Sequence, residues 1–133
     1  MAKFTGAARS NYFKVKDAEL FKEWVLSIPS LSIFKGEGKQ DGLFAIYSDC
    51  PDTGCWPSGC FDEVEIDLAV DLSVHLAEGQ IAVLMEAGAE RLRYLAGYAV
   101  AVNWKGETEY LNLNQIYDLA EKRFGIRPCE ASN

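Results

Sequence analysis

The sequence predicts an α+β domain, in which an antiparallel sheet of about five to six strands is packed by about three helices. Strand-like segments follow one another over short turns, as in an antiparallel meander. Amphipathic segments with capping residues lie between them, and helices packed on such a sheet form an α+β fold. The 133 residues, 49% of them hydrophobic, suffice for one domain with its own core. We expect residues 1–10 and 128–133 to be loose tails.

The first part of the chain predicts a strand, a helix and a hairpin. Residues 12–16 have the pattern of a short strand, and Asp17 can cap the helix that follows. This helix ends before Pro29. Its apolar stripe consists of Leu20, Phe21, Trp24, Val25 and Ile28. Residues 31–34 and 43–47 flank the turn-forming stretch KGEGKQDG, which predicts a hairpin.

The middle of the chain predicts a long loop and an ambiguous segment. Residues 48–61 hold two prolines, two glycines and three cysteines, and loops of this length are commonly functional. Residues 64–76 alternate apolar and polar side chains like a strand, yet they also contain a helical stripe. We favour a helix over residues 67–78, with Asp67 as its cap and Gly79 past its end.

The last part predicts three strands and a helix. The strands cover residues 81–85, 92–102 and 108–113, the last two joined by a turn around Gly106. Asn114 can cap the final helix, and Gly125 suits its C-terminal end. The side chains expected to face the sheet are Ile116, Tyr117, Ala120 and Phe124.

The charge is unevenly distributed along the chain. Residues 40–90 hold 11 of the 20 acidic side chains and no Lys or Arg, within a net charge of −7. A broad basic face for nucleic acid or an anionic membrane is therefore not expected. An acidic surface either keeps the protein soluble or steers a basic partner toward it. Carboxylates along one face can also occupy a nucleic-acid channel in place of phosphates, as a DNA mimic does.

Cys50, Cys55 and Cys60 stand in a C-x4-C-x4-C arrangement, with Cys129 as the remaining thiol. Zinc held by these residues, a disulfide and free thiols are the alternatives, and the reducing cytosol favours free thiols. The acidic surroundings oppose thiolate formation at a catalytic cysteine. No cofactor is expected.

Features of an enzyme are sparse in this sequence. His75 is the sole histidine, which limits triads and histidine-based zinc sites. Glu63, Glu65 and Asp67 could hold a divalent cation if extended, but no lysine or arginine is close in sequence. We expect a non-enzymatic protein. The N-terminal segment has no apolar run of seven residues, so we also expect a soluble, cytoplasmic protein.

A resemblance adds a partner class to this interpretation. The stretch HLAEGQIAVLMEAGAERLRYLAGYAVAVNWKGE at residues 75–107, with NYFKVK before it and WPS between, resembles small proteins of phages and mobile elements. These include anti-CRISPR inhibitors, several of which are acidic and block nucleic-acid-binding effectors. The resemblance implies an inhibitor of a bacterial defence complex.

We therefore expect a protein-binding inhibitor that acts through an acidic face on a partner with a basic surface, such as a CRISPR effector. The expected partner-binding residues are Asp49, Asp52, Trp56, Asp62, Glu63, Glu65, Asp67 and Asp71. One alternative is a small metal-binding or redox protein centred on Cys50, Cys55 and Cys60. Another is a structural accessory protein, for example a homodimer formed through a spare sheet edge.

Overall fold

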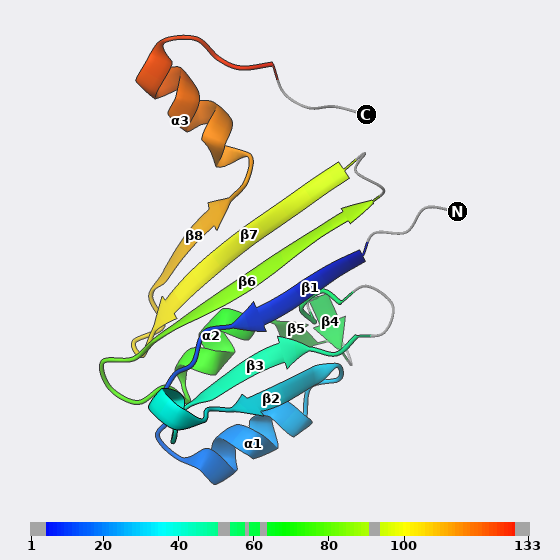
Figure 1. The fold of residues 1–133 in the computed structure, drawn as a ribbon. Helices are drawn as coiled ribbons and strands as arrows, with labels where there is room; N and C mark the ends of the chain where they lie inside the picture. The colour runs from blue at the N-terminus through cyan, green and yellow to red at the C-terminus, as the bar shows by residue number, and fades with distance from the viewer. Residues whose placement is uncertain (1–4, 51–53, 58, 62–63, 91–93, 130–133) are drawn as a thin grey trace.

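The fold is a six-stranded antiparallel sheet with helices, as the sequence predicts. The computed structural model describes residues 5–50, 54–57, 59–61, 64–90 and 94–129. The strand order is β2-β3-β1-β6-β7-β8 (Figure 1). The strands are β1 (Thr5–Ser10), β2 (Leu31–Lys35), β3 (Phe44–Ser48), β6 (Ile81–Glu90), β7 (Tyr94–Asn103) and β8 (Thr108–Asn112). A separate pair is formed by β4 (Gly59–Phe61) and β5 (Val64–Ile66).

Two predictions for the N-terminal segment are wrong. Thr5–Ser10 was expected within a loose tail, but it lies inside the sheet and pairs with both β6 and β3. The strand predicted over residues 12–16 is wrong, because Phe13 and Val15 make only isolated bridges, to Phe44 and Leu76. Glycine and alanine give β1 a weak strand signal in the sequence. The hydrogen bonds of β1 to strands on both sides stabilise it as a strand despite this low propensity.

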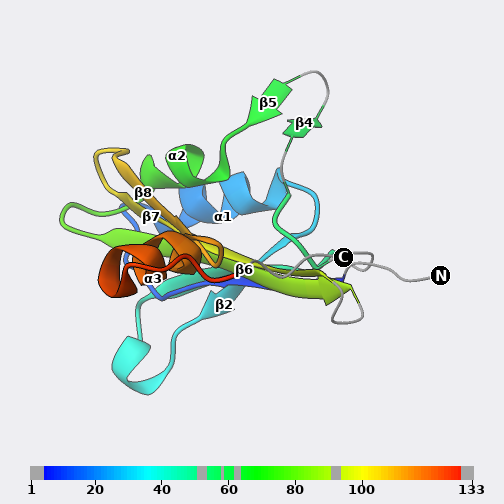
Figure 2. The same cartoon turned by 90° about the horizontal axis from the view of Figure 1, so that it is seen from above.

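One face of the sheet is covered by α1 (Ala18–Leu26) and α2 (Leu68–Ser73), and the β4–β5 pair projects away from the sheet on the same side (Figure 2). Asp17 caps α1 as predicted, since its side chain accepts hydrogen bonds from the backbone N–H groups of Glu19 and Leu20. The apolar stripe is confirmed except at Leu20, which is exposed. The largest fully buried side chains of this layer include Phe13, Phe21, Ile46, Leu72, Leu76 and Leu84.

The ambiguous segment contains both a strand and a helix. Val64–Ile66 forms β5, and α2 then runs from Leu68 to Ser73, with Asp67 accepting a hydrogen bond from the N–H of Val70. The predicted cap is confirmed, but the helix is shorter than residues 67–78. The predicted loop over residues 48–61 also ends in a strand, β4, which pairs with β5.

The C-terminal strands are confirmed, and the packing of the last helix is not. The hairpins of β6, β7 and β8 follow the predicted meander, with β6 extending to Glu90. Helix α3 (Gln115–Phe124) ends at Gly125, whose φ is 78°. Its Ile116 and Phe124 are exposed, so neither is buried against the sheet, and α3 continues beyond the β8 edge (Figure 1). No helix in the described ranges is long and apolar enough to cross a membrane.

Candidate functional site

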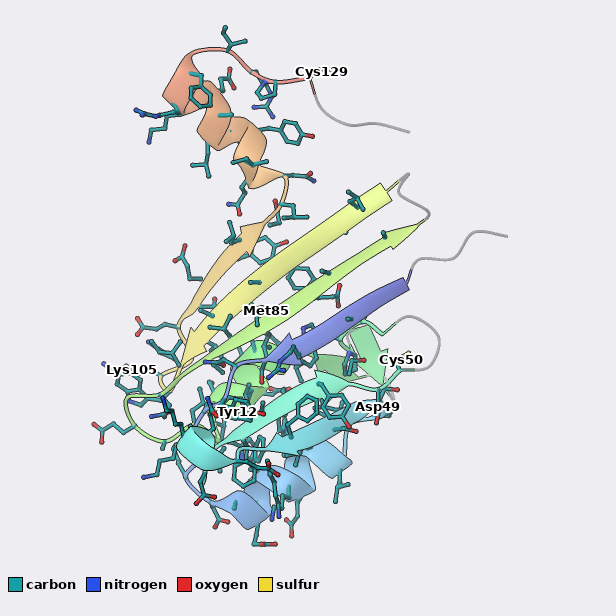
Figure 3. The ribbon with its side chains drawn as sticks, in the orientation of Figure 1. Tyr12, Asp49, Cys50, Met85, Lys105 and Cys129 are labelled. Atoms are coloured by element: carbon teal, nitrogen blue, oxygen red, sulfur yellow. The ribbon has the colours of Figure 1, made fainter. Side chains whose placement is uncertain are left out.

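The described part of the predicted acidic face consists of three exposed carboxylates. Asp67 and Asp71 lie one turn apart on α2, where the N–H of Asp71 donates to the carbonyl oxygen of Asp67 at 2.9 Å. Asp49 lies elsewhere, at the corner where β3 ends and β2 begins, and accepts a hydrogen bond from the Ser32 hydroxyl (Figure 3). In the described ranges none of the three makes an ion pair with Lys or Arg.

The remaining acidic positions lie outside the described residues. Asp52, Asp62 and Glu63 belong to ranges that are not described, and so does the side chain of Glu65 on β5. Asp67 and Asp71 are therefore the pair that the structure brings together. Asp67 also caps α2 and Asp49 holds Ser32, so both carboxylates have structural roles as well.

Trp56 belongs to the core. Its side chain is 6% exposed and packs in the main hydrophobic cluster. This position favours the alternative interpretation, in which the loop packs back onto the core, over an exposed anchor for a partner. Its indole Nε1 is buried and has no hydrogen-bond partner in the described part of the chain. We leave Trp56 out of the proposed interface.

Among the described cysteines, Cys129 lies apart from Cys50. Cys50 and Cys55 are half-buried in the same loop, and Cys129 is exposed after α3. Figure 3 shows Cys50 and Cys129 in well-separated parts of the molecule, so they cannot share one zinc ion in this structure. The side chain of Cys60 is not described. Among the side chains that are described, no three of His, Cys, Asp and Glu gather as metal ligands would.

His75 packs against aromatic rings at the end of α2. Its ring centroid lies 5.1 Å from that of Trp24 and 6.2 Å from that of Phe21. Partial burial lowers the pKa of His75, the nearby Lys16 lowers it further, and Asp71 opposes the shift. A packed histidine with a lowered pKa agrees with the structural role that a lone histidine usually has.

A polar cluster that sequence analysis missed surrounds Glu86 on β6. Its Oε1 atom accepts hydrogen bonds from the backbone N–H of Trp56 at 2.8 Å and from the hydroxyl of Tyr98 at 3.4 Å. Desolvation, followed by the charge of Glu86, raises the pKa of Tyr98 to about 12. Tyr98 therefore stays protonated at neutral pH. The cluster connects the cysteine-containing loop between β3 and β4, called the cysteine loop below, to β6 and β7.

The second missed feature is an apolar groove of about 880 Å³ on the face of the sheet opposite α1 and α2. Directly paired residues share a face, so the pairings of Met85 with Arg9 and Ala99, and of Ala99 with Leu111, define a row across four strands. Phe34 and Tyr47 stack at one end with centroids 4.2 Å apart. Ile116 and Leu119 of α3 line the groove as well.

Comparisons with protein-family models, curated proteins and solved structures gave no match for this chain. Its function has to be inferred from its own residues.

The sequence does contain a signal for the groove, which is a pair of strands with apolar side chains on both faces. The solvent face of an antiparallel sheet is normally polar, so its strands alternate apolar and polar side chains. Here both faces of β6 and β7 consist mainly of apolar or small residues, with Glu86 as an exception; Leu84 points toward the helices and Met85 toward the groove. A strand that is apolar on both faces predicts a sheet covered on both sides.

Proposed function

We propose that the chain is a non-enzymatic inhibitor that binds the basic surface of a bacterial nucleic-acid-handling defence complex. The contact surface is the acidic face predicted from residues 40–90. Asp67, which caps α2, and Asp71 on α2 belong to it. The resemblance to anti-CRISPR proteins supports the partner class, and the charge distribution supports the mode of binding.

One observation supports this proposal above the others. Asp67 and Asp71 are exposed on consecutive turns, make no ion pair in the described part of the chain, and lie in a 51-residue segment without Lys or Arg. Exposed charges that lack internal partners keep their field available to steer and position an oppositely charged protein. Carboxylates at such positions can pair with the Lys and Arg side chains that otherwise bind phosphates.

The test is affinity capture from bacterial lysates that contain CRISPR and restriction complexes, with captured proteins identified by mass spectrometry. The test variant combines Asp49→Asn, Asp67→Asn and Asp71→Asn. Asparagine keeps the capping oxygen at position 67, so helix α2 should be retained. The matched control combines Glu19→Gln, Glu23→Gln and Glu37→Gln, which removes the same charge from exposed positions outside residues 40–90.

We expect the parent and the control to capture a DNA-handling complex that the test variant does not capture. Binding by the parent should also weaken as salt is raised, because exposed charges are screened. Equal capture by the test variant and the control would show that the acidic segment has no part in binding. The carboxylates would then serve solubility alone.

A further inference from the structure

We propose that the groove on the open sheet face binds a second copy of this chain, and that the two copies exchange their α3 helices in a symmetric homodimer. This inference is independent of the proposed inhibitor function. It starts from the groove, whose floor includes Met85, Ala87 and Ala99 and whose volume is about 880 Å³. Exposed apolar patches that are rimmed by polar residues often mark protein–protein interaction sites.

Helix α3 has the complementary property. Ile116, Leu119, Ala120 and Phe124 recur at helical spacing and form one apolar face. None of them is buried, and Ile116, Leu119 and Phe124 are 60%, 56% and 74% exposed. A helix of ten residues is marginal in water without packing contacts. The contacts that α3 makes with its own chain therefore leave most of its apolar face exposed.

The position of α3 favours a copy of the same chain as that surface. The helix leaves the sheet at β8 and extends past this edge, away from its own strands (Figure 1). Its first turns, at Ile116 and Leu119, still line the groove, whereas Phe124 lies farther out along the helix. Each copy thus offers one groove and one projecting helix. In a dimer with two-fold symmetry, the helix of each copy can pack in the groove of the other, which gives an isologous interface.

The open sheet face carries charges of both signs, because Arg9 lines the groove and Glu109 lies on the same face of the sheet. Arg123 follows Leu119 by four residues, so it lies on the apolar side of α3. The acidic side chains Asp118 and Glu121 are engaged by Arg127, at 2.7 and 3.0 Å. The open sheet face presents Glu109, which pairs with Ala101 and therefore shares the face of Leu111. A copy whose α3 reaches this face brings Arg123 to a surface that contains a carboxylate.

The available area is also adequate. The exposed apolar side chains on β8, α3 and the segments after them are Leu111, Leu113, Ile116, Leu119, Phe124 and Ile126. Each of these side chains exposes an apolar area on the order of 100 Å². Together with the groove floor, they approach the roughly 800 Å² per partner that a stable interface buries.

The test is the oligomeric state of the full chain, measured by light scattering and sedimentation equilibrium over a wide concentration range. Leu119→Asp places a charge on the apolar face of α3, and Met85→Asp places one on the groove floor with the helix unchanged. The matched control is Leu20→Asp on α1, which lies on the opposite side of the sheet. Leu20 has the same 56% exposure as Leu119.

We expect a dimer for the parent and for Leu20→Asp. In both interface variants we expect the dimer dissociation constant to rise by about 30-fold or more. Circular dichroism should show the same sheet content in all four proteins. A parent that stays monomeric at every concentration, or interface variants that dimerise like the parent, would overturn the proposal. The Asp49, Asp67 and Asp71 variant should remain dimeric, so the two proposals can fail separately.

Discussion

Trp56 and Glu86 are 30 residues apart in the sequence, and a hydrogen bond of 2.8 Å joins the backbone N–H of Trp56 to the Oε1 atom of Glu86. The same carboxylate oxygen accepts the hydroxyl of Tyr98 at 3.4 Å. One side chain of the sheet thus holds the cysteine loop in position. Removing the Glu86 side chain should therefore destabilise the loop as well as the strand.

The first prediction concerns Glu86→Ala. This change leaves the half-buried N–H of Trp56 without its acceptor, and an unsatisfied donor costs about 1–3 kcal/mol. We expect a loss of this size in the free energy of unfolding, measured by urea denaturation with tryptophan fluorescence. Glu86→Gln keeps an acceptor oxygen and should lose less. Equal losses in the two variants would contradict the role assigned to this hydrogen bond.

The second prediction concerns alkaline stability. The pKa of Tyr98 rises from 10.0 to about 12, chiefly by desolvation, so the unfolded chain releases this proton first. The stabilising contribution of Tyr98 is complete below pH 10 and is lost as the pH rises toward 12. The free energy of unfolding of the parent should fall more steeply in this window than that of Tyr98→Phe. Parallel curves would refute the shift.

The third prediction concerns His75, whose pKa is lowered from 6.5 by desolvation and by Lys16. Because the unfolded chain binds this proton more readily, the contribution of His75 is present above pH 6.5 and is lost as the pH falls through the folded-state pKa. As the chain has one histidine, NMR should show a single imidazole titration, with a midpoint below 6.5. A midpoint at or above this value would show that Asp71 outweighs burial.

The fourth prediction concerns Gly54 in the cysteine loop. Its φ is 72°, and a Cβ atom at this position would clash with the carbonyl oxygen of Gly6 on β1. Gly54→Ala should therefore cost about 1–3 kcal/mol, because both the backbone conformation and the close approach disfavour a side chain. Gly79→Ala is the control, since its φ is 82° but nothing lies near its Cβ. Urea denaturation should show the larger loss for Gly54→Ala.

The fifth prediction concerns metal content. Cys129 lies far from Cys50, so we expect freshly purified protein to contain no stoichiometric zinc. Elemental analysis and intact mass under native conditions test this directly. One zinc per chain, removed by a chelator with loss of structure, would instead support the metal-binding alternative centred on Cys50, Cys55 and Cys60.

The sequence predicts those elements whose signals are local. Asp17 and Asp67 cap their helices as expected, because a capping side chain contacts only the next few residues. Glycine at position 125 ends α3 for an equally local reason, its positive φ. The fold class and the meander of β6, β7 and β8 follow from such signals.

The elements that were missed depend on distant partners. β1 is built from small residues and is recognisable as a strand only through its pairing with β6, more than seventy residues later. The residues next to Trp56 in the sequence are typical of an exposed loop, and its burial depends on the distant core residues that it packs against. The apolar pattern of β6 and β7 indicates a sheet covered on both faces, but the groove itself depends on the register that brings Met85, Ala99 and Leu111 side by side.

The place of β1 between β3 and β6 has a consequence for the order of folding. The first strand to be synthesised cannot complete its hydrogen bonds until β6 has emerged, and β1 is the strand that joins the β2–β3 hairpin to the C-terminal meander. Pairings so distant in sequence are formed late and slowly. A nascent chain should therefore hold two separate hairpin units that become one sheet only after most of the protein has been made.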